Sequence, residues 1–341
     1  VSGSFWGTTT VGSFTLPSNG KQDAVLFCVL LDQLGSVQWA KSYGGTDIDS
    51  FLDLSVSSKG KIFALGNYQN SLEVAGKTLI SEGDGSFLLK LDPNGIESNT
   101  LDISGQSRVA AKKLTLDSSE KHLLIAGVFD NHFRIGSSQL LSQGEEDFFL
   151  AKLNPETFSL EGMRGFGGSG EDSFFDLEMD HGNRALLAAG FQGILNLDGV
   201  VHSSKGLQDS VIAKVDLSDL SVLDSRSFGG SGDDEIQTIH SYNAASLFIG
   251  GYSTDSSVVT LSNEYLSKAF LGKMAETDSE IQLLNPSPSL VSAGKPFEYS
   301  FDSGPWRIEN NEFTIRKIDF PTWLTIAIEP SGRGILSGIA P

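Results

Sequence analysis

Hydrophobic and polar positions alternate along the chain as short apolar runs separated by turns rich in Gly, Asp and Asn. In residues 165–193, a glycine turn at 167–170 precedes an apolar run at 174–179, and a turn at 180–183 leads into a second run at 185–191. Two short β-rich runs joined by such a turn predict a β-hairpin. No window shows a sustained 3.6-residue apolar period with helix caps, so we expect almost no helix.

Three landmarks repeat along the chain, and repeats of this length are typical of modular folds. The first is a glycine closely followed by an aromatic residue, at Gly3/Phe5, Gly66/Tyr68, Gly127/Phe129, Gly190/Phe191 and Gly250/Tyr252. The second is an apolar strand ending in Lys-apolar-Asp or a related sequence, with lysines at Lys90, Lys152, Lys214 and Lys273 and a divergent copy at 26–32. The third is aromatic-Gly-Gly, at 43–45, 166–168 and 228–230, with a degraded copy at 103–105.

Each repeat contains four strand-like runs, which in the second copy are residues 51–56, 61–68, 86–91 and 98–103. One four-stranded antiparallel meander per repeat is the unit of a β-propeller blade. A lone blade cannot bury both faces of its sheet, whereas blades stacked around an axis bury them. We therefore predict an all-β fold, a β-propeller of four-stranded blades with about five blades visible and a repeat of about 62 residues.

The repeat resembles the bacterial β-propeller repeats called SBBP repeats, whose pattern is G-x-F … D-x-F-x-x-K-L-D … W-x-x-x-F-G-G-x-G-x-D. The pattern is carried by Gly127/Phe129 with residues 147–154 and 166–172, and again by Gly190/Phe191 with residues 209–216 and 228–234. Trp39 stands four residues before Tyr43 as the pattern requires, but Gly162 and Asp224 replace the tryptophan in later copies. The resemblance covers about residues 1–280 and implies a propeller, without indicating a ligand.

The repeat ends near Met274, and residues 285–288 (Asn-Pro-Ser-Pro) are typical of a linker. Residues 295–301 then alternate as a strand. The P-x-W-L … L-S-G-x-x-P arrangement over 321–341 resembles the Ig-like, cadherin-like modules of bacterial surface proteins, and we predict that Trp323 anchors the core of such a sandwich.

We predict two domains, propeller repeats over residues 1–283 and an Ig-like (cadherin-like) module, possibly truncated, over residues 284–341. The first repeat lacks its opening strand. Two explanations fit the absence of this strand: a five-bladed ring closes by borrowing a strand, or upstream blades are missing. We expect the chain to be part of a longer protein.

Composition narrows the class of partner. The chain has 341 residues and a formal net charge of −19, which argues against binding nucleic acid or an anionic membrane. Its single cysteine, Cys28, lies in an apolar run and is expected to pack as a small apolar residue. No run of about 18 apolar residues is present, so we expect no membrane insertion.

Searches for catalytic motifs find no match. Residues 76–78 (Gly-Lys-Thr) imitate the end of a P-loop, but Ser71 stands where that motif needs its first glycine. Glu171 replaces the closing glycine of a nucleophile elbow at 167–171. The five histidines occupy different phases of the repeat, which disfavours a histidine metal site. We therefore predict no catalytic or cofactor-binding residues and no enzyme activity.

Acidic residues follow the glycine turns and leave two interpretations open. Aligning the turns places Asp49, Asp172 and Asp234 at one position, with Asp47, Glu171 and Asp233 beside them and Ser107 or Arg108 in the degraded copy. A carboxylate after a Gly-Gly turn accepts backbone N–H bonds and stabilises the turn. Alternatively, clusters such as 47/49/53 or 171/172/176 supply hard oxygen ligands, so calcium is the one cofactor considered.

These observations predict a non-enzymatic, secreted or cell-surface protein that acts in adhesion, as a structural scaffold, or as a binding platform within a larger bacterial protein. The expected partners are a protein or glycan on a cell surface or in the matrix, and further domains of a longer chain. A carbohydrate-binding or carbohydrate-active propeller is one alternative, with Trp6 and Tyr242 as candidate stacking residues. A subunit of an assembled surface fibre is another.

Overall fold

The computed structural model describes residues 1–31, 35–243, 246–254, 268–276, 281–283, 296–302, 324–328 and 333–339. Every regular element in these ranges is a β-strand, so the all-β prediction is confirmed. All the strand pairs within the sheets are antiparallel and most are consecutive in sequence. No helix in the described ranges is long and apolar enough to cross a membrane.

The described strands form a series of meanders that match the repeat. The first is three-stranded: β1 (Ser2–Val11), β2 (Phe14–Val29) and β3 (Val37–Tyr43). The second meander consists of β4 (Ser50–Val56), β5 (Ile62–Val74), β6 (Lys77–Leu91) and β7 (Glu97–Gly105). The third consists of β8 (Val109–Leu116), β9 (Leu123–Ile135), β10 (Ser138–Leu153) and β11 (Leu160–Phe166). The fourth consists of β12 (Ser173–Met179), β13 (Ala185–Phe191), β16 (Asp209–Val215) and β17 (Val222–Phe228). The fifth consists of β18 (Asp234–Asn243), β19 (Ser246–Ser253), β20 (Lys268–Glu276) and β21 (Ile281–Leu283).

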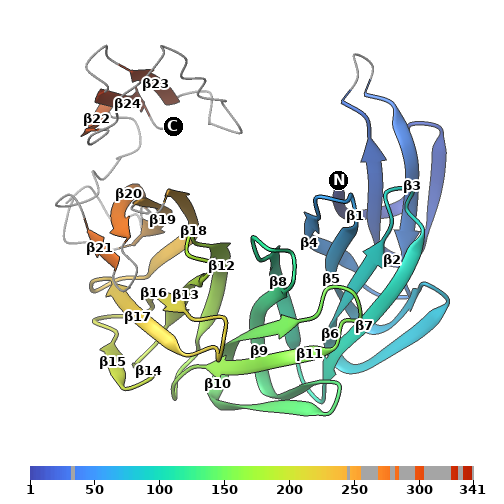
Figure 1. Cartoon of the computed structure of the whole chain (residues 1–341), viewed down its shortest axis with the longest axis horizontal. Coiled ribbons are helices and arrows are strands. Elements are labelled where there is room, and N and C mark those ends of the chain that lie inside the picture. The colour runs from blue at the N-terminus through green and yellow to red at the C-terminus, as the bar shows by residue number, and fades with distance from the viewer. Residues whose placement is uncertain are drawn as a thin grey trace.

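A short pairing of β7 with β9 joins the second and third meanders into one eight-stranded sheet; each of the five meanders is called a sheet here. These five sheets follow one another along an arc, with the first and fifth at its two ends (Figure 1). The opening strands β4, β8, β12 and β18 lie on the concave side, where β4 contacts β8, β8 contacts β12, and β12 contacts β18. Strand β1 corresponds to the second strand of a later meander, because it pairs with β2 as β5 pairs with β6. The first sheet therefore lacks the opening strand, as the sequence predicted.

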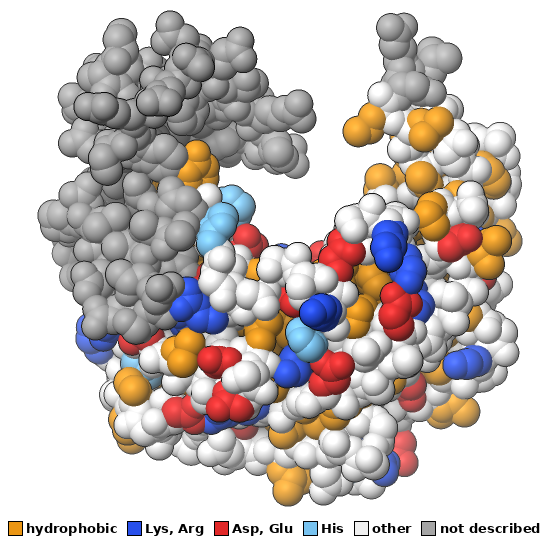
Figure 2. Space-filling model, in the orientation of Figure 1, with side chains coloured by type: hydrophobic (Ala, Val, Ile, Leu, Met, Phe, Trp, Pro, Cys, Tyr) orange, Lys and Arg blue, Asp and Glu red, His pale blue; other side chains and the backbone are white. Residues whose placement is uncertain are grey.

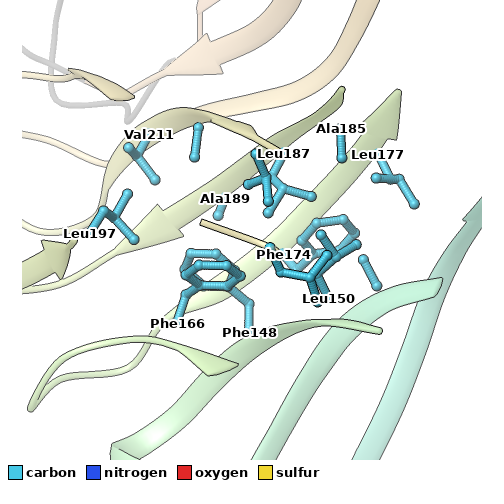
Figure 3. Packing of buried hydrophobic residues seen from close by; sticks show 14 of the residues in the cluster. Phe148, Leu150, Phe166, Phe174, Leu177, Ala185, Leu187, Ala189, Leu197 and Val211 are labelled. Carbon is cyan, nitrogen blue, oxygen red and sulfur yellow. The ribbon is translucent and has the colours of Figure 1, made fainter. Parts of the chain in front are cut away.

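Consecutive sheets share a hydrophobic core because alternate residues of each strand point to opposite faces. In β9, Leu124, Ala126 and Val128 pack toward the fourth sheet, whereas Leu123 and Ile125 pack toward the second. Figure 3 shows the core between the third and fourth sheets, where the rings of Phe148 and Phe166 stack 5.4 Å apart. Burial on both faces explains why these strands are continuously apolar instead of alternating.

Each of the first four sheets also carries a hairpin that the sequence did not reveal. The second and third strands continue past the predicted runs, so that β5 and β6 pair as far as Val74 and Lys77. The fourth sheet has the same hairpin as separate strands, β14 (Ile194–Leu197) and β15 (Val200–Ser203). Alternate apolar residues of these hairpins are buried, including Leu72, Val74, Leu195 and Leu197.

At the C-terminus, β22 (Pro296–Asp302), β24 (Arg333–Ile339) and β23 (Leu324–Ile328) form a three-stranded antiparallel sheet in that order. The strand predicted at 295–301 is confirmed within one residue. Trp323 and the linker predicted at 285–288 lie outside the described residues.

Candidate functional site

The recurring glycine turns sit at the joints between consecutive sheets. At the joint between the third and fourth sheets, a Cβ atom added to Gly167 would collide with the carboxyl group of Asp147 in β10. One added to Gly168 would collide with the main-chain oxygen of Ile194 in the next sheet's hairpin. Gly168 also bridges to Leu195. Both glycines are therefore required by close approach of a neighbouring group.

Two buried carboxyl groups flank this dipeptide. The Oδ2 atom of Asp172 accepts the N–H of Gly168 at 2.6 Å, and the Oδ2 atom of Asp147 accepts the N–H of Gln143 at 2.9 Å. The N–H of Asp172 donates to the carbonyl of Glu146 at 2.7 Å, so the two acids lie beside each other across the joint. Their exposed fractions are 1% for Asp147 and 0% for Asp172.

The same acid pair recurs at two other joints. Asp23 and Asp49 flank Gly44–Gly45 between the first and second sheets, and Asp209 and Asp234 flank Gly229–Gly230 between the fourth and fifth. In both, the second acid accepts the N–H of the second glycine at 2.7 Å. We call these three pairs, Asp23–Asp49, Asp147–Asp172 and Asp209–Asp234, the joint acid pairs.

One oxygen of most of these carboxyl groups is buried without a hydrogen-bond partner. These atoms are Oδ1 of Asp23, Asp49, Asp147, Asp172 and Asp209. A buried carboxylate without compensation is costly, and two of them side by side also repel each other.

Burial raises the pKa of every one of these five acids. It raises the pKa of Asp49 and of Asp147 to about 6, and the pKa of Asp172 to about 7. In Asp172 the neighbouring charge of Asp147 adds to the effect of burial, whereas hydrogen bonds from the backbone of Gly168 and of Gln192 oppose it. Burial likewise raises the pKa of Asp23 and of Asp209.

The joint between the second and third sheets lacks both acids, and the first glycine of its turn is replaced as well. Strand register places Gly85 where the other sheets have Asp147 or its equivalents, and the buried Val109, instead of Ser107 or Arg108, where they have Asp172. Ser104 then stands in place of the first glycine. Because no carboxyl group fills the space opposite, a side chain fits there. The second glycine is retained as Gly105, which pairs with Phe133 of the next sheet.

The other acids predicted as calcium ligands do not join these pairs. Asp47 forms an ion pair with Lys21 at 3.0 Å and accepts a hydrogen bond from Asn70, while Glu171 is exposed. Asp233 accepts the N–H of Gln208 at 3.2 Å.

The predicted clusters 47/49/53 and 171/172/176 separate in the same way. Asp53 accepts the N–H of Leu114 at 2.9 Å, and Asp176 accepts that of Ile239 at 2.9 Å, so each binds the opening strand of a following sheet. Within the described residues, no three or more His, Cys, Asp or Glu side chains are grouped to hold a metal ion.

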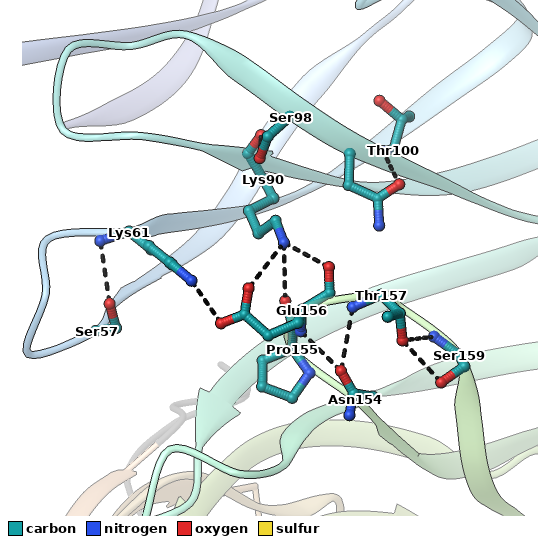
Figure 4. A network of polar contacts seen from close by, with 11 residues as sticks. Ser57, Lys61, Lys90, Ser98, Thr100, Asn154, Pro155, Glu156, Thr157 and Ser159 are labelled. Carbon is teal, nitrogen blue, oxygen red and sulfur yellow. Dashed lines mark hydrogen bonds and ion pairs between the residues drawn. The ribbon is translucent and has the colours of Figure 1, made fainter.

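Two of the landmark lysines also connect consecutive sheets, whereas Lys214 forms an ion pair with Asp180 of its own sheet at 3.7 Å. The buried Lys90 ammonium donates to the main-chain carbonyl of Glu156 at 2.5 Å, in the turn between the last two strands of the next sheet (Figure 4). Lys152 donates to the carbonyl of Leu217 in the equivalent turn at 2.6 Å. These long-range partners are invisible in the sequence, because each lysine reaches 65 or 66 residues along the chain.

Two aromatic residues predicted as stacking candidates are exposed. The side chain of Trp6 in β1 is 71% exposed, and Tyr242 in β18 is 41% exposed with its ring edge against Phe248. Over the described part of the face seen in Figure 2, acidic and basic side chains are interspersed.

Comparison with known proteins gives no relative: no protein-family model matches the chain, and no curated protein matches it.

Proposed function

We propose that the chain is a β-propeller with a C-terminal Ig-like module, and that it acts without catalysis at the cell surface or after secretion. In this role it is a scaffold or binding platform that presents a recognition surface in adhesion. The order of the five meanders, with their opening strands adjacent on the concave side, supports the propeller.

One observation carries the functional proposal: the residues that repeat are used to hold the sheets together. The glycine turns, the strand-end lysines Lys90 and Lys152, and the joint acids contact a neighbouring sheet or its connection. Function is therefore assigned to residues that differ from sheet to sheet and remain exposed, as in other repeat proteins whose stacked units build an extended binding surface.

A specific observation favours the carbohydrate-binding alternative. Trp6 and Tyr242 are exposed aromatic residues on opposite end sheets, and neither belongs to the repeat landmarks. An exposed aromatic face with a polar rim suits stacking of an apolar ligand face.

The test is binding of the fluorescently labelled full chain to immobilised glycans, matrix proteins and intact bacterial or host cells. We expect selective, saturable binding that is reduced at least about tenfold by Trp6→Ala or Tyr242→Ala if a glycan is the ligand. Lys59→Ala, an exposed change outside the landmarks, is the matched control and should bind normally. Absence of saturable binding to every surface would contradict the binding-platform proposal.

A further inference from the structure

The hairpin of the first sheet, made by the distal parts of β1 and β2, has one face that does not pack on the core. Directly opposed residues of an antiparallel pair lie on the same face of the sheet. On the packed face, Phe5, Val11 and Leu16 belong to one apolar cluster. The other face carries three opposed pairs, which are Trp6–Gln22, Thr8–Pro17 and Thr10–Thr15. We call these six residues the first-hairpin face.

The first-hairpin face is uncharged, unlike the corresponding faces of the next two hairpins. In the second sheet the equivalent opposed pairs are Gln69–Asp84, Ser71–Ile80 and Glu73–Thr78. In the third sheet they are Asp130–Glu146, His132–Leu141 and Arg134–Gln139. Among residues 1–22 the only charged side chain is that of Lys21, which is paired with Asp47 at 3.0 Å. A chain of net charge −19 therefore keeps one hairpin free of acidic residues.

The side chains of this face are open to solvent. Trp6 is 71% exposed, the threonines and Pro17 are exposed, and Gln22 is half-buried. The other tryptophan of the first sheet is used differently, because the indole N–H of Trp39 donates to the Pro93 carbonyl of the second sheet at 3.1 Å. Trp39 thus holds two sheets together, whereas the ring of Trp6 is left free to contact a ligand.

The chemistry of the face favours one class of ligand. An indole ring offers a flat apolar surface, and threonine hydroxyls and a glutamine amide both donate and accept hydrogen bonds. A sugar ring has the matching features, an apolar face and a rim of hydroxyl groups. An anionic glycan would find no unpaired cation on this face and would be repelled by the net charge of the chain. A protein interface is typically enriched in several aromatic and arginine residues, whereas this face has one aromatic residue and no arginine.

We propose that the first-hairpin face binds an uncharged polysaccharide, with one sugar ring stacked on Trp6 and the hydroxyl groups of the following rings hydrogen-bonded to Thr8 and Thr10. These three residues follow one strand over about 13 Å, at about 3.3 Å per residue, so the face suits an extended chain of sugars better than a single one. The inference rests on the carbohydrate-binding form of the proposed function and narrows it to one face and one class of glycan.

The test is affinity electrophoresis of the full chain through native gels that each contain one soluble polysaccharide. The neutral probes are dextran, mannan, laminarin and galactomannan, and the anionic probes are alginate and heparin. We expect at least one neutral polysaccharide to retard the chain, with a dissociation constant that changes less than about twofold between about 10 and 200 mM sodium chloride, because salt screens only charged contacts. Retardation by the anionic probes alone, or by none of the neutral ones, would overturn the proposal.

Variants of the face separate stacking from hydrogen bonding. Trp6→Ala should weaken binding of the retarding polysaccharide at least about tenfold, because the stacked ring and its apolar contact area are lost. Trp6→Phe keeps an aromatic face and should bind within about threefold of the unmodified protein. Thr10→Val removes a hydroxyl and should weaken binding by about threefold or more. All three side-chain changes are at exposed positions, so the melting temperature should stay the same.

The second hairpin supplies matched controls. Ile80 is 70% exposed at the position equivalent to Pro17, and Thr78 is equivalent to Thr15. Ile80→Ala and Thr78→Val should therefore bind normally, and a loss equal to that of Trp6→Ala would contradict the assignment to the first hairpin.

Failure of this inference is distinguishable from failure of the proposed function. Normal binding by Trp6→Ala together with loss of binding by Tyr242→Ala would reject the first-hairpin face and leave a carbohydrate-binding protein. Absence of saturable binding to glycans, matrix proteins and cells alike would reject both.

Discussion

At the residue scale, the sequence motif aromatic-Gly-Gly-x-Gly-x-Asp is explained by what touches each position. The first glycine leaves room for a carboxyl group from the third strand, and the second leaves room for the backbone of the next hairpin. The aspartate accepts a hydrogen bond from the N–H of the second glycine. At the joint where Gly85 replaces the acid, Ser104 replaces the first glycine, which agrees with this explanation.

This explanation predicts the effect of Gly168→Ala. The added methyl group would overlap the Ile194 carbonyl, so the joint must shift, and we expect the free energy of unfolding to fall by about 1–3 kcal/mol in urea titrations. Gly3→Ala is the control, because nothing lies within 4 Å of a Cβ atom there, and it should change stability by less than about 0.5 kcal/mol. Equal effects of the two substitutions would contradict the close approach at Gly168.

At the element scale, the strands and their antiparallel order within a meander were predictable, but the full lengths of the strands were not. Apolar runs and Asp/Gly turns located the first and fourth strands of the second meander to within two residues, whereas β5 ends six residues later and β6 begins nine residues earlier than predicted. Local periodicity could not show that β5 and β6 continue as a hairpin, because the polar residues 69–71 interrupt the apolar run at a register shift.

The candidate site was only half predicted. Asp49, Asp172 and Asp234 were found because they follow a recognisable turn. Their partners Asp23, Asp147 and Asp209 stand 25 or 26 residues earlier, in β2, β10 and β16. Asp147 and Asp209 were noticed only as the first residues of runs in the repeat pattern, and Asp23 was not singled out. Pairing them requires the strand register, which places each opposite the first glycine of the turn.

The β14–β15 hairpin supplies a second prediction. Leu195 is fully buried in the core between the third and fourth sheets, whereas its neighbour Ile194 is 59% exposed. Leu195→Ala should lower the free energy of unfolding by about 2–5 kcal/mol, and Ile194→Ala by less than about 0.5 kcal/mol, in the same denaturant titration. A similar small loss for both would mean that the hairpin does not pack on the core.

At the scale of the whole molecule, the excess negative charge opposes compactness. A formal net charge of −19 produces self-repulsion that salt screens over about 10 Å at 0.1 M. Raising sodium chloride from about 10 to about 200 mM at pH 8 should therefore raise the melting temperature measured by calorimetry. Near pH 4.5, the sequence isoelectric point, the same addition should have little effect, and an equal rise there would argue against self-repulsion.

The contacts of Lys90 and Lys152 always run from one sheet to the sheet that follows it in the sequence. Lys90 and Lys152 each bind a turn that is made 65 or 66 residues later, so a sheet gains this fastening only after its successor has been synthesised. At about 5–20 residues per second, a ribosome needs roughly 3–13 s to supply those residues. During translation, the second and third sheets therefore gain this contact only several seconds after their own residues emerge, and the Lys90 and Lys152 ammonium groups stay hydrated until then.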